Sequence, residues 1–348
     1  HKRHIMQYSN SKTPSLLFMR WRSFYAHKMA RFSLFCFIFI FIVSLFAPFL
    51  ANDKPLLIYK NNSFYFPIFI DYSEVEFGGD FYTTPDYKDP YVRNLFANDF
   101  ILYPLIEYAA DSIDWNLKGI PPTPPSREHI LGTDDQGRDV CARLLYGLRT
   151  SLLFGIILSV CSVCIGVIIG GMQGYYGGLI DLFGQRALEI WSGMPTLFVI
   201  IIVSSFILPT FWIILGIVLL FSWTSIVGVV RAEFLRARTQ DYVKASKVLG
   251  FSDLRIMFVH ILPNALIATI TYLPFITIGS ITTLATLDFL GFGMPLGSAS
   301  LGELLNQGKN NIQAPHLGIA GFLVMSIVLS LLVFIGEGVR VAFSESKH

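Results

Sequence analysis

An acidic cluster, Asp134, Asp135 and Asp139, is the first pattern in this chain that could do chemistry, because neighbouring carboxylates are typical ligands of divalent cations. A calcium-binding loop of the EF-hand kind also needs alternating Asp or Asn residues, Gly at its sixth position and Glu at its twelfth. These features are not present together here. Turn residues lead from the cluster into a helix. We therefore interpret residues 131–139 as a structural cap at the outer interface rather than as a metal site.

Two further patterns resemble chemical motifs but fail on their spacing. A phosphate-binding loop reads G-x-x-x-x-G-K-[ST], whereas the string from Gly302 to Lys309 has one residue too many and no hydroxyl after the lysine. Cys161 and Cys164 lie in an apolar run with no histidine or second cysteine pair nearby, which indicates apolar filling. The sequence thus predicts no catalytic residue, no metal and no cofactor in this chain.

The one polar, helix-forming stretch between long apolar runs is Asp241 to Asn264. It contains two short helices, with Gly250 as the stop of the first and Ser252 as the N-cap of the second. Pro263 is expected to open or kink the next stretch of the chain. Residues of the first helix at offsets of three and four form a narrow stripe that suits a groove: Tyr242, Ala245, Ser246 and Leu249.

Basic residues surround this stripe, namely Arg231, Arg236, Arg238, Lys244, Lys247 and Arg255. Two interpretations are open. The loop either docks into a cleft of a cytoplasmic protein, or lies as a basic amphipathic helix on the anionic inner leaflet of a membrane.

An apolar composition places the chain in a membrane, since 53% of its 348 residues are hydrophobic and 14% are charged. Six segments are predicted to span it as helices: 32–50, 150–172, 197–208, 212–230, 262–287 and 317–336. The first gives about 28 Å of helix against a hydrocarbon layer of about 30 Å. A cleaved signal peptide is the alternative for this segment, but the preceding basic region is long and no clear cleavage site comes after it.

The distribution of charge predicts the topology. Residues 1–31 carry seven Lys or Arg and no acidic residue, which indicates a cytoplasmic tail. Residues 51–148 then form a periplasmic segment and residues 149–340 a transmembrane core with a cytoplasmic loop at 231–262. Residues 341–348 form a second cytoplasmic tail. The sequence therefore predicts an all-α, multi-pass membrane protein of six helices with both termini in the cytoplasm.

The outer segment is rich in aromatic residues and proline, which favours folded structure over a flexible linker. It could contact a soluble substrate-binding protein, cap a pore entrance or act only as a packing appendage. Four glycines at intervals of four residues begin inside the second span and continue past its end, and they predict a closely packed helix face: Gly166, Gly170, Gly174 and Gly178.

The predicted spans contain almost no ionisable side chains, with Asp288 and Glu337 at their ends. Carriers coupled to protons or sodium use carboxylates or histidines within the membrane, so this class is disfavoured. The energy for transport is therefore expected from a partner, and the polar loop around Gly250 has the position and length to receive it as a movement.

At this loop the chain resembles the permease subunits of ABC importers, whose signature reads Glu-Ala-Ala, three residues, Gly, nine residues, Ile, one residue, Leu-Pro. Lys244-Ala245-Ser246, Gly250 and Leu262-Pro263 match that spacing, with His260 in place of Ile. The resemblance marks one set of residues as the ATPase-coupling loop: Asp241, Tyr242, Lys244, Ala245, Ser246, Leu249, Gly250, His260, Leu262 and Pro263.

Further strings resemble the dipeptide and oligopeptide permeases, in particular the Yej-type branch associated with oligopeptides and the antibiotic microcin C. They include Trp191 to Thr196 and Leu287 to Gly293. The resemblance implies a type I ABC importer permease in the inner membrane of a Gram-negative bacterium. It implies as partners a second homologous permease, a cytoplasmic ABC ATPase that binds ATP and Mg, a periplasmic peptide-binding protein, the peptide and membrane lipid, but no nucleic acid. An ATPase-independent channel or exporter and a membrane scaffold are the alternatives.

Overall fold

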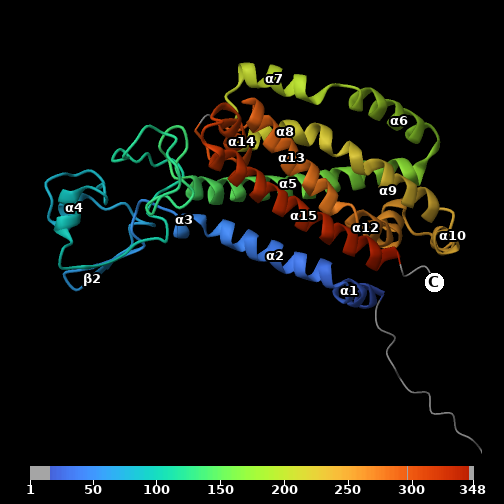
Figure 1. Ribbon diagram of the computed structural model, residues 1–348. Helices are drawn as coiled ribbons and strands as arrows, with labels where there is room; N and C mark the ends of the chain where they lie inside the picture. Colours follow the sequence, from blue (N-terminus) through green and yellow to red (C-terminus); the bar gives the residue numbers. More distant parts are fainter. Residues whose placement is uncertain (1–15, 296, 345–348) are drawn as a thin grey trace, which may run out of the picture.

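The computed structural model describes residues 16–295 and 297–344; the ends of the two predicted tails, residues 1–15 and 345–348, lie outside the described residues. Long apolar helices form a bundle, and a small lobe of short strands and loops stands at one end of it (Figure 1). The fold is mostly helical, but the prediction of an all-α chain misses the three strands of the lobe. They hold only three or four residues each, too few for a readable alternation of polar and apolar residues.

The elements succeed one another along the chain from the bundle into the lobe and back. Before and within the lobe these are α1 (Leu16–Ala26), α2 (Lys28–Leu45), α3 (Ala47–Leu50), β1 (Leu57–Lys60), β2 (Ser63–Tyr65), η1 (Glu74–Phe77), α4 (Pro90–Leu95) and β3 (Phe100–Leu102). The bundle continues with α5 (Val140–Tyr176), α6 (Gly178–Ser192), α7 (Thr196–Phe206), α8 (Phe211–Ser222), α9 (Thr224–Ala237), α10 (Asp241–Val248), α11 (Asp253–Arg255), η2 (Ile256–Ile261), α12 (Leu262–Ile270), α13 (Leu273–Leu290), α14 (Leu301–Asn310) and α15 (Pro315–Ser344).

Among the described residues, 5 helices are long and apolar enough to cross a membrane, or up to 7 if each of two bent pairs counts as one span. The bent pairs are α6 with α7, at 65°, and α8 with α9, at 41°. The chain is therefore a multi-pass membrane protein. At 37 residues α5 is about 55 Å long, so it extends well beyond a hydrocarbon layer of about 30 Å.

Two sequence boundaries change in the structure. The second predicted span, Thr150 to Met172, is the middle of α5, which begins ten residues earlier at Val140. The stretch between the predicted spans 262–287 and 317–336 contains an additional helix, α14. Its mixed polarity hid it from a search for long apolar runs, because only one face of this short helix is buried.

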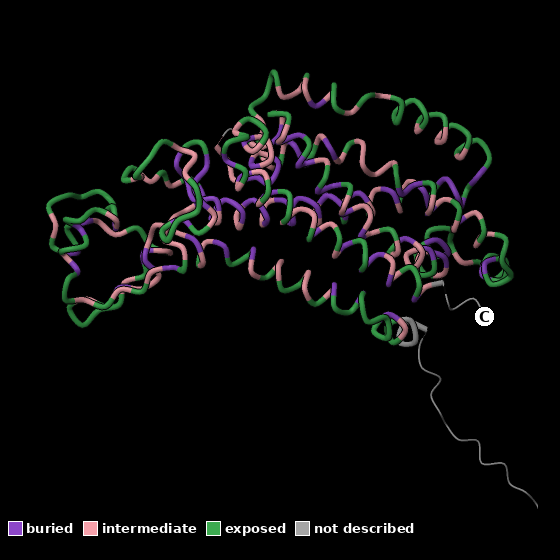
Figure 2. Tube along the Cα trace, in the orientation of Figure 1, coloured by how far each residue is buried: buried purple, intermediate pink, exposed green. Residues whose placement is uncertain are grey.

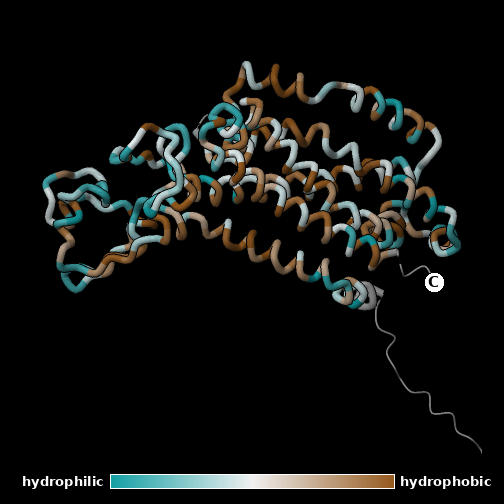
Figure 3. Tube along the Cα trace, viewed as in Figure 1, coloured by the Kyte–Doolittle hydropathy of each residue, from teal (hydrophilic) through white to brown (hydrophobic). Residues whose placement is uncertain are grey.

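The core of the bundle lies along α5. Figure 2 shows that buried residues concentrate on this helix, whereas α2 is exposed along most of its length. Apolar residues continue over the exposed surface of the bundle in Figure 3, and polar residues gather in the lobe and around α10. This pattern is the one expected of helices that face lipid, since lipid is as apolar as a protein core.

Glycines on α5 allow α9 to approach closely. A Cβ atom on Gly166, Gly170 or Gly174 would lie 3.2 Å or less from atoms of α9, including 2.7 Å from the Val227 carbonyl oxygen for Gly170. The predicted packed face is therefore confirmed for these three glycines. Gly178 does not belong to it, because α5 ends before it and a Cβ there would meet nothing within 4 Å.

We expect Gly170→Ala to lower the stability of the bundle, although alanine is the better helix former. Its methyl group would meet a backbone carbonyl that cannot rotate away, and overpacking of this kind costs about 1–3 kcal/mol. Gly228→Ala is the matched control on α9, because a Cβ at Gly228 meets nothing within 4 Å. Thermal unfolding of the two purified variants checks this. Equal midpoints would show that the helices are not in close contact.

The lobe has a small core of its own. Its antiparallel sheet has the strand order β2-β1-β3, with Tyr59 opposite both Phe64 and Phe100. On the other face of the sheet, Ile58 packs with Phe77 and Phe96 and with neighbouring aromatic rings. Phe64 and Phe100 remain 63% and 59% exposed. The lobe is thus folded, as its composition predicted, and it presents one aromatic face to the outside.

The lobe and α10 lie at opposite ends of the bundle (Figure 1). Helix α1 and the C-terminal end of α15 lie at the same end as α10. Whatever side of the membrane α10 faces, the two ends of the described chain share it.

Candidate coupling site

Helix α10 is a separate short helix with a defined stop. It begins after Gln240 and ends at Val248, and Gly250 comes two residues later with a φ of +77°. The Phe251 N–H donates to the Ser246 carbonyl at 3.2 Å, which closes the helix end in the way a left-handed glycine allows. The prediction that Gly250 terminates this helix is confirmed.

One face of α10 is anchored in the bundle. Val243 is fully buried and Ser246 is 6% exposed. Val243 belongs to a cluster that includes Phe234 of α9 and Ile256 of η2, so the helix packs on α9 and η2. The Ser246 hydroxyl donates to the Tyr242 carbonyl at 2.8 Å, within the helix. An anchor of this kind lets α10 transmit a displacement to the bundle instead of swinging freely.

The opposite face of α10 is apolar and open. Val248 is 89% exposed, Leu249 is 73% exposed and Tyr242 is 41% exposed, with Ala245 also exposed between them. The sequence-based stripe placed Ser246 at its centre, but this residue points inward and Val248 takes its place on the outer face. The spacing of residues in the sequence does not indicate which side of the helix the bundle covers.

Charged residues of the loop are mostly paired or stacked locally. Asp241 and Lys244 form an exposed ion pair at 3.4 Å. The Lys247 ammonium lies 4.9 Å from the ring centroid of Tyr175, at the end of α5, and the Tyr175 hydroxyl donates to Asp253. These contacts fix the loop to α5. They leave the apolar face of α10 flanked by lysines.

The second half of the predicted loop is continuous with a long helix. Ser252 precedes α11, which runs through the π-helical turn η2 into α12. Pro263 lies in the first turn of α12, directly after η2, and does not open the chain. The wider π turn lies directly before the position where the regular helix would need the N–H group that proline lacks. Leu262 is half-buried and Pro263 is exposed.

His260 lies apart from the exposed face of α10. Its ring is 5.7 Å from that of Phe251, and its buried Nε2 has no hydrogen-bond partner in the described residues. Of the predicted set, the structure therefore brings Tyr242, Ala245 and Leu249 together on one surface. Ser246 faces the bundle behind that surface, and His260 packs against Phe251.

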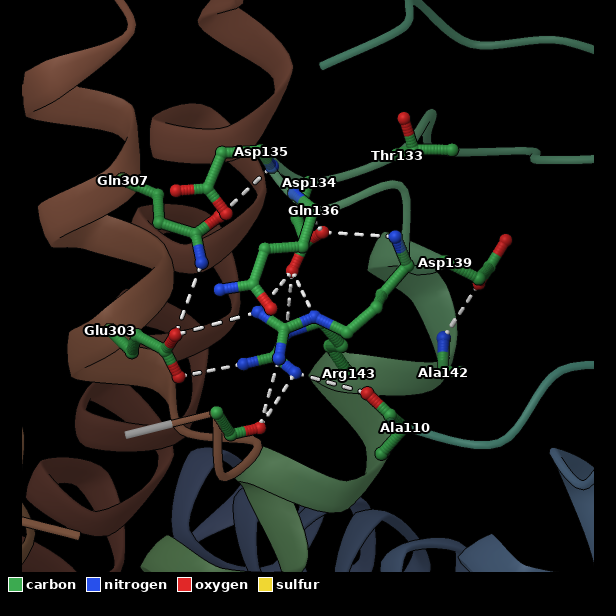
Figure 4. A network of polar contacts seen from close by, with 12 residues as sticks. Ala110, Thr133, Asp134, Asp135, Gln136, Asp139, Ala142, Arg143, Glu303 and Gln307 are labelled. Carbon is green, nitrogen blue, oxygen red and sulfur yellow. Dashed lines mark hydrogen bonds and ion pairs between the residues drawn. The ribbon is translucent and has the colours of Figure 1, made fainter. Parts of the chain in front are cut away.

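At the other end of the bundle, Asp134 of the acidic cluster is paired with arginines, whereas Asp139 is paired with a histidine. Asp134 is fully buried and lies 2.7 Å from Arg138 and 3.2 Å from Arg143 (Figure 4). Asp139 accepts the Ala142 N–H at 2.8 Å and caps α5. The interpretation of this stretch as a structural cap is confirmed.

Arg143 joins three segments that are distant in sequence, and sequence reasoning missed it. Its guanidinium lies 2.6 Å from Glu303 of α14 and donates to the Ala110 carbonyl oxygen (Figure 4). It also donates to the Ser298 carbonyl oxygen. We call the group Asp134, Arg138, Arg143 and Glu303 the outer clamp. The sequence did contain a signal for this residue, because an arginine near the end of an apolar helix carries a charge that is costly unless it is paired.

A histidine connects the clamp region to the loop below the lobe. The buried His129 ring lies 2.8 Å from Asp139 and 3.1 Å from Asp114, with Tyr108 stacked beside it. Burial alone would lower the pKa of His129, but the hydrogen bonds that its ring donates to Asp139 and Asp114 outweigh burial and raise this pKa. Lys88 lies over the Tyr108 ring, and burial lowers the pKa of Lys88 to about 8.

We expect the contact of His129 with Asp139 and Asp114 to weaken as the pH rises. Because the folded-state pKa of His129 is above its ordinary value of about 6.5, the stabilisation is complete below that pH and is lost as the pH passes the folded pKa. The measurement is thermal unfolding between about pH 6 and about pH 7.5, because this range stays below the pH at which Lys88 titrates. His129→Gln should flatten the pH dependence in this window. An unchanged slope would show that His129 is not charged in the folded protein.

The fold and the two sites define a multi-pass membrane protein with a polar, helix-containing loop at one end and a folded lobe at the other. Comparison with known families gives the particular class. Residues 162–346 match the family of binding-protein-dependent transport system inner membrane components, and residues 15–67 match the N-terminal transmembrane domain of oligopeptide transport permease C. The chain belongs to this family of ABC transporter permeases.

Relatives cover almost the whole chain. It is 54% identical over 329 residues to the inner membrane ABC transporter permease protein YejE of Escherichia coli, covering 94% of this chain and 96% of that protein. It is 47% identical to the peptidoglycan transport system permease protein YejE of Agrobacterium fabrum, over 94% and 92% of the two chains. The oligopeptide transport system permease protein OppC of Lactococcus lactis is 32% identical, over 69% and 83%.

Among solved structures, a chain of the inward-facing MetNI methionine ABC transporter is similar to this one. It shares 16% identity with this chain and has a TM-score of 0.45, covering 57% of this chain and 96% of its own.

Proposed function

We propose that this chain is the permease subunit of an ATP-driven peptide importer, that it forms half of the translocation pathway and that it contains no motor of its own. One observation supports this most strongly: the anchored helix α10 presents Tyr242, Ala245, Val248 and Leu249 outward in a chain of the ABC permease family. An apolar helix face between lysines, fixed to the bundle behind it, suits a groove on another protein. We assign that groove to a cytoplasmic ABC ATPase, which would bind the ATP and Mg.

The proposed topology has six spans with both termini in the cytoplasm. It takes α6–α7 and α8–α9 as one bent span each, and α11 to α13 as one span that begins outside the membrane. The lobe then lies in the periplasm, because it stands at the end of the bundle opposite α10 (Figure 1). The seven basic residues and absent acids of residues 1–31 support the orientation.

The proposed partners are a second homologous permease, the ATPase and a periplasmic peptide-binding protein. We assign the exposed aromatic face of the lobe, formed by Tyr59, Phe64 and Phe100, to contact with the binding protein. Aromatic residues of this exposure are enriched where proteins bind one another. The cargo is proposed to be a peptide, in line with relatives named for oligopeptide and dipeptide transport. Uptake of microcin C stays a prediction.

Reconstitution of the full complex in vesicles tests the proposal. Uptake of a labelled oligopeptide should require ATP, the second permease, the ATPase and the binding protein, and omission of any one should abolish it.

Phe64→Asp should weaken binding of the peptide-binding protein and leave the ATPase bound, because a charge would enter an apolar contact. Full transport by this subunit without any ATPase would instead identify a channel or exporter. Normal uptake by cells that lack the chain would identify a scaffold.

A further inference from the structure

An apolar groove lies at the end of the bundle where α10 is found. Its volume is about 260 Å³, and every residue that lines it is apolar. The walls come from three regions of the chain: Trp21 and Phe24 of α1, Leu273 and Pro274 of α13, and Ile335 and Val339 of α15. None of these residues belongs to the coupling face or to the outer clamp.

The walls of the groove are held firmly. Phe24, Ala30 and Ala342 form a buried cluster of their own. A Cβ on Gly338 would lie 2.1 Å from the Ala30 Cβ, so the turn between α1 and α2 sits tightly on α15. The groove is therefore a built feature of the bundle and not a gap left by a loose helix.

The groove lies at the edge of the hydrocarbon layer. Leu34, which also lines it, is six residues after the start of α2, or about 9 Å along a helix that is long enough to span the membrane. Trp21 is 57% exposed at its entrance, and Tyr25 is 48% exposed one turn later. Aromatic residues with this exposure are typical of the level of the lipid headgroups.

Exposed cations lie close in the chain to the residues that line the groove. Arg22 directly follows Trp21, and Lys28 and Arg31 precede Leu34 on α2; all three cations are exposed, and the Arg31 guanidinium donates back across the turn to the Tyr25 carbonyl. The first 50 residues of the chain contain no acidic residue. On α15, Arg340 is paired with Glu337 at 3.4 Å. An apolar groove with exposed cations on the helices that form its walls matches a molecule with an acyl chain and an anionic headgroup.

We propose that this groove binds an anionic phospholipid of the membrane leaflet on the α10 side, with one acyl chain against Phe24 and Val339 and the phosphate between Arg22, Lys28 and Arg31. The lipid would wedge α1 between α13 and α15 and so fix the inner end of the bundle. The identity of the leaflet rests on the proposed orientation of the chain, but the binding of lipid does not depend on transport.

Native mass spectrometry of the purified complex tests the proposal. The probes are phosphatidylglycerol and phosphatidylcholine with identical acyl chains, added to delipidated protein. We expect preferential retention of phosphatidylglycerol, and Arg22→Gln with Arg31→Gln should lower this preference by about fivefold for each charge removed. Arg186→Gln is the control, because Arg186 forms an exposed ion pair with Glu189 on another helix.

Variants that fill the groove distinguish lipid bound at this site from lipid that surrounds the whole protein. Val339→Trp should abolish retention of the lipid, whereas Ile327→Trp, at a 51% exposed position of the same helix, should not. Equal retention by Val339→Trp and the unmodified complex would overturn the proposal. So would a photo-cross-link from position 21 to a partner subunit in place of lipid. Either result leaves the assignment of peptide import intact, because uptake is measured separately.

Discussion

Arginine in place of Ala245 is expected to uncouple the transporter while leaving it folded. Ala245 is exposed on the outer face of α10, beside Leu249 and one turn after Tyr242, so the larger side chain can extend away from the subunit. In the assembled complex it would place a bulky, unpaired charge in an apolar groove. A central contact of that kind is typically worth at least about 2 kcal/mol, so we expect peptide uptake to fall by roughly thirty-fold.

The same position supplies the control for this prediction. Ala245→Ser keeps the side chain small and neutral and should retain both assembly and uptake. Measured together, ATPase stimulation by the peptide-loaded binding protein and uptake in vesicles should both fail in Ala245→Arg. Transport at the unmodified rate by a complex that contains this arginine would show that the face is not a docking surface.

The second large effect is expected at the outer clamp. Arg143→Ala removes a guanidinium that is fully buried, leaves Glu303 without its nearest cation and leaves Asp134 with Arg138 alone. Breaking a buried ion pair by removing one partner typically costs about 3–5 kcal/mol, because the remaining charge stays uncompensated. Thermal unfolding of the purified subunit should therefore show a marked loss of stability.

An exposed ion pair in the same protein gives a matched comparison. Arg186 and Glu189 are also 2.6 Å apart, but their side chains are 67% and 60% exposed. Because surface pairs contribute about 0–1 kcal/mol, Arg186→Ala should change stability little. A similar small effect for both arginines would mean that the clamp is open to water in the native protein.

The sequence predicted most of the bundle because lipid imposes long apolar helices, and these are visible as composition alone. It also predicted the stop at Gly250, since a left-handed residue after a short helix leaves a local signal. The cap at Asp139 was readable for the same reason, because a capping side chain acts on residues three positions away.

What the sequence could not show depends on contacts between distant residues. Arg143 and Glu303 are 160 residues apart, and neither stretch of sequence indicates that it contacts the other. Ser246 fits the spacing of the outer stripe as well as Tyr242 does, and only the position of α9 and η2 decides that it faces inward. The π turn before Pro263 depends likewise on packing, because Ile256, Met257 and Ile261 must all remain buried while the helix continues.

The most direct test of the account is a photoreactive amino acid in place of Val248, the most exposed residue on the outer face of α10. In the assembled complex it should cross-link to the ATPase, and the yield should change when ATP is added. The same group in place of Phe64, at the far end of the molecule, should give no ATPase cross-link. Cross-links from position 248 to lipid alone, or to a protein on the periplasmic side, would contradict the proposed coupling.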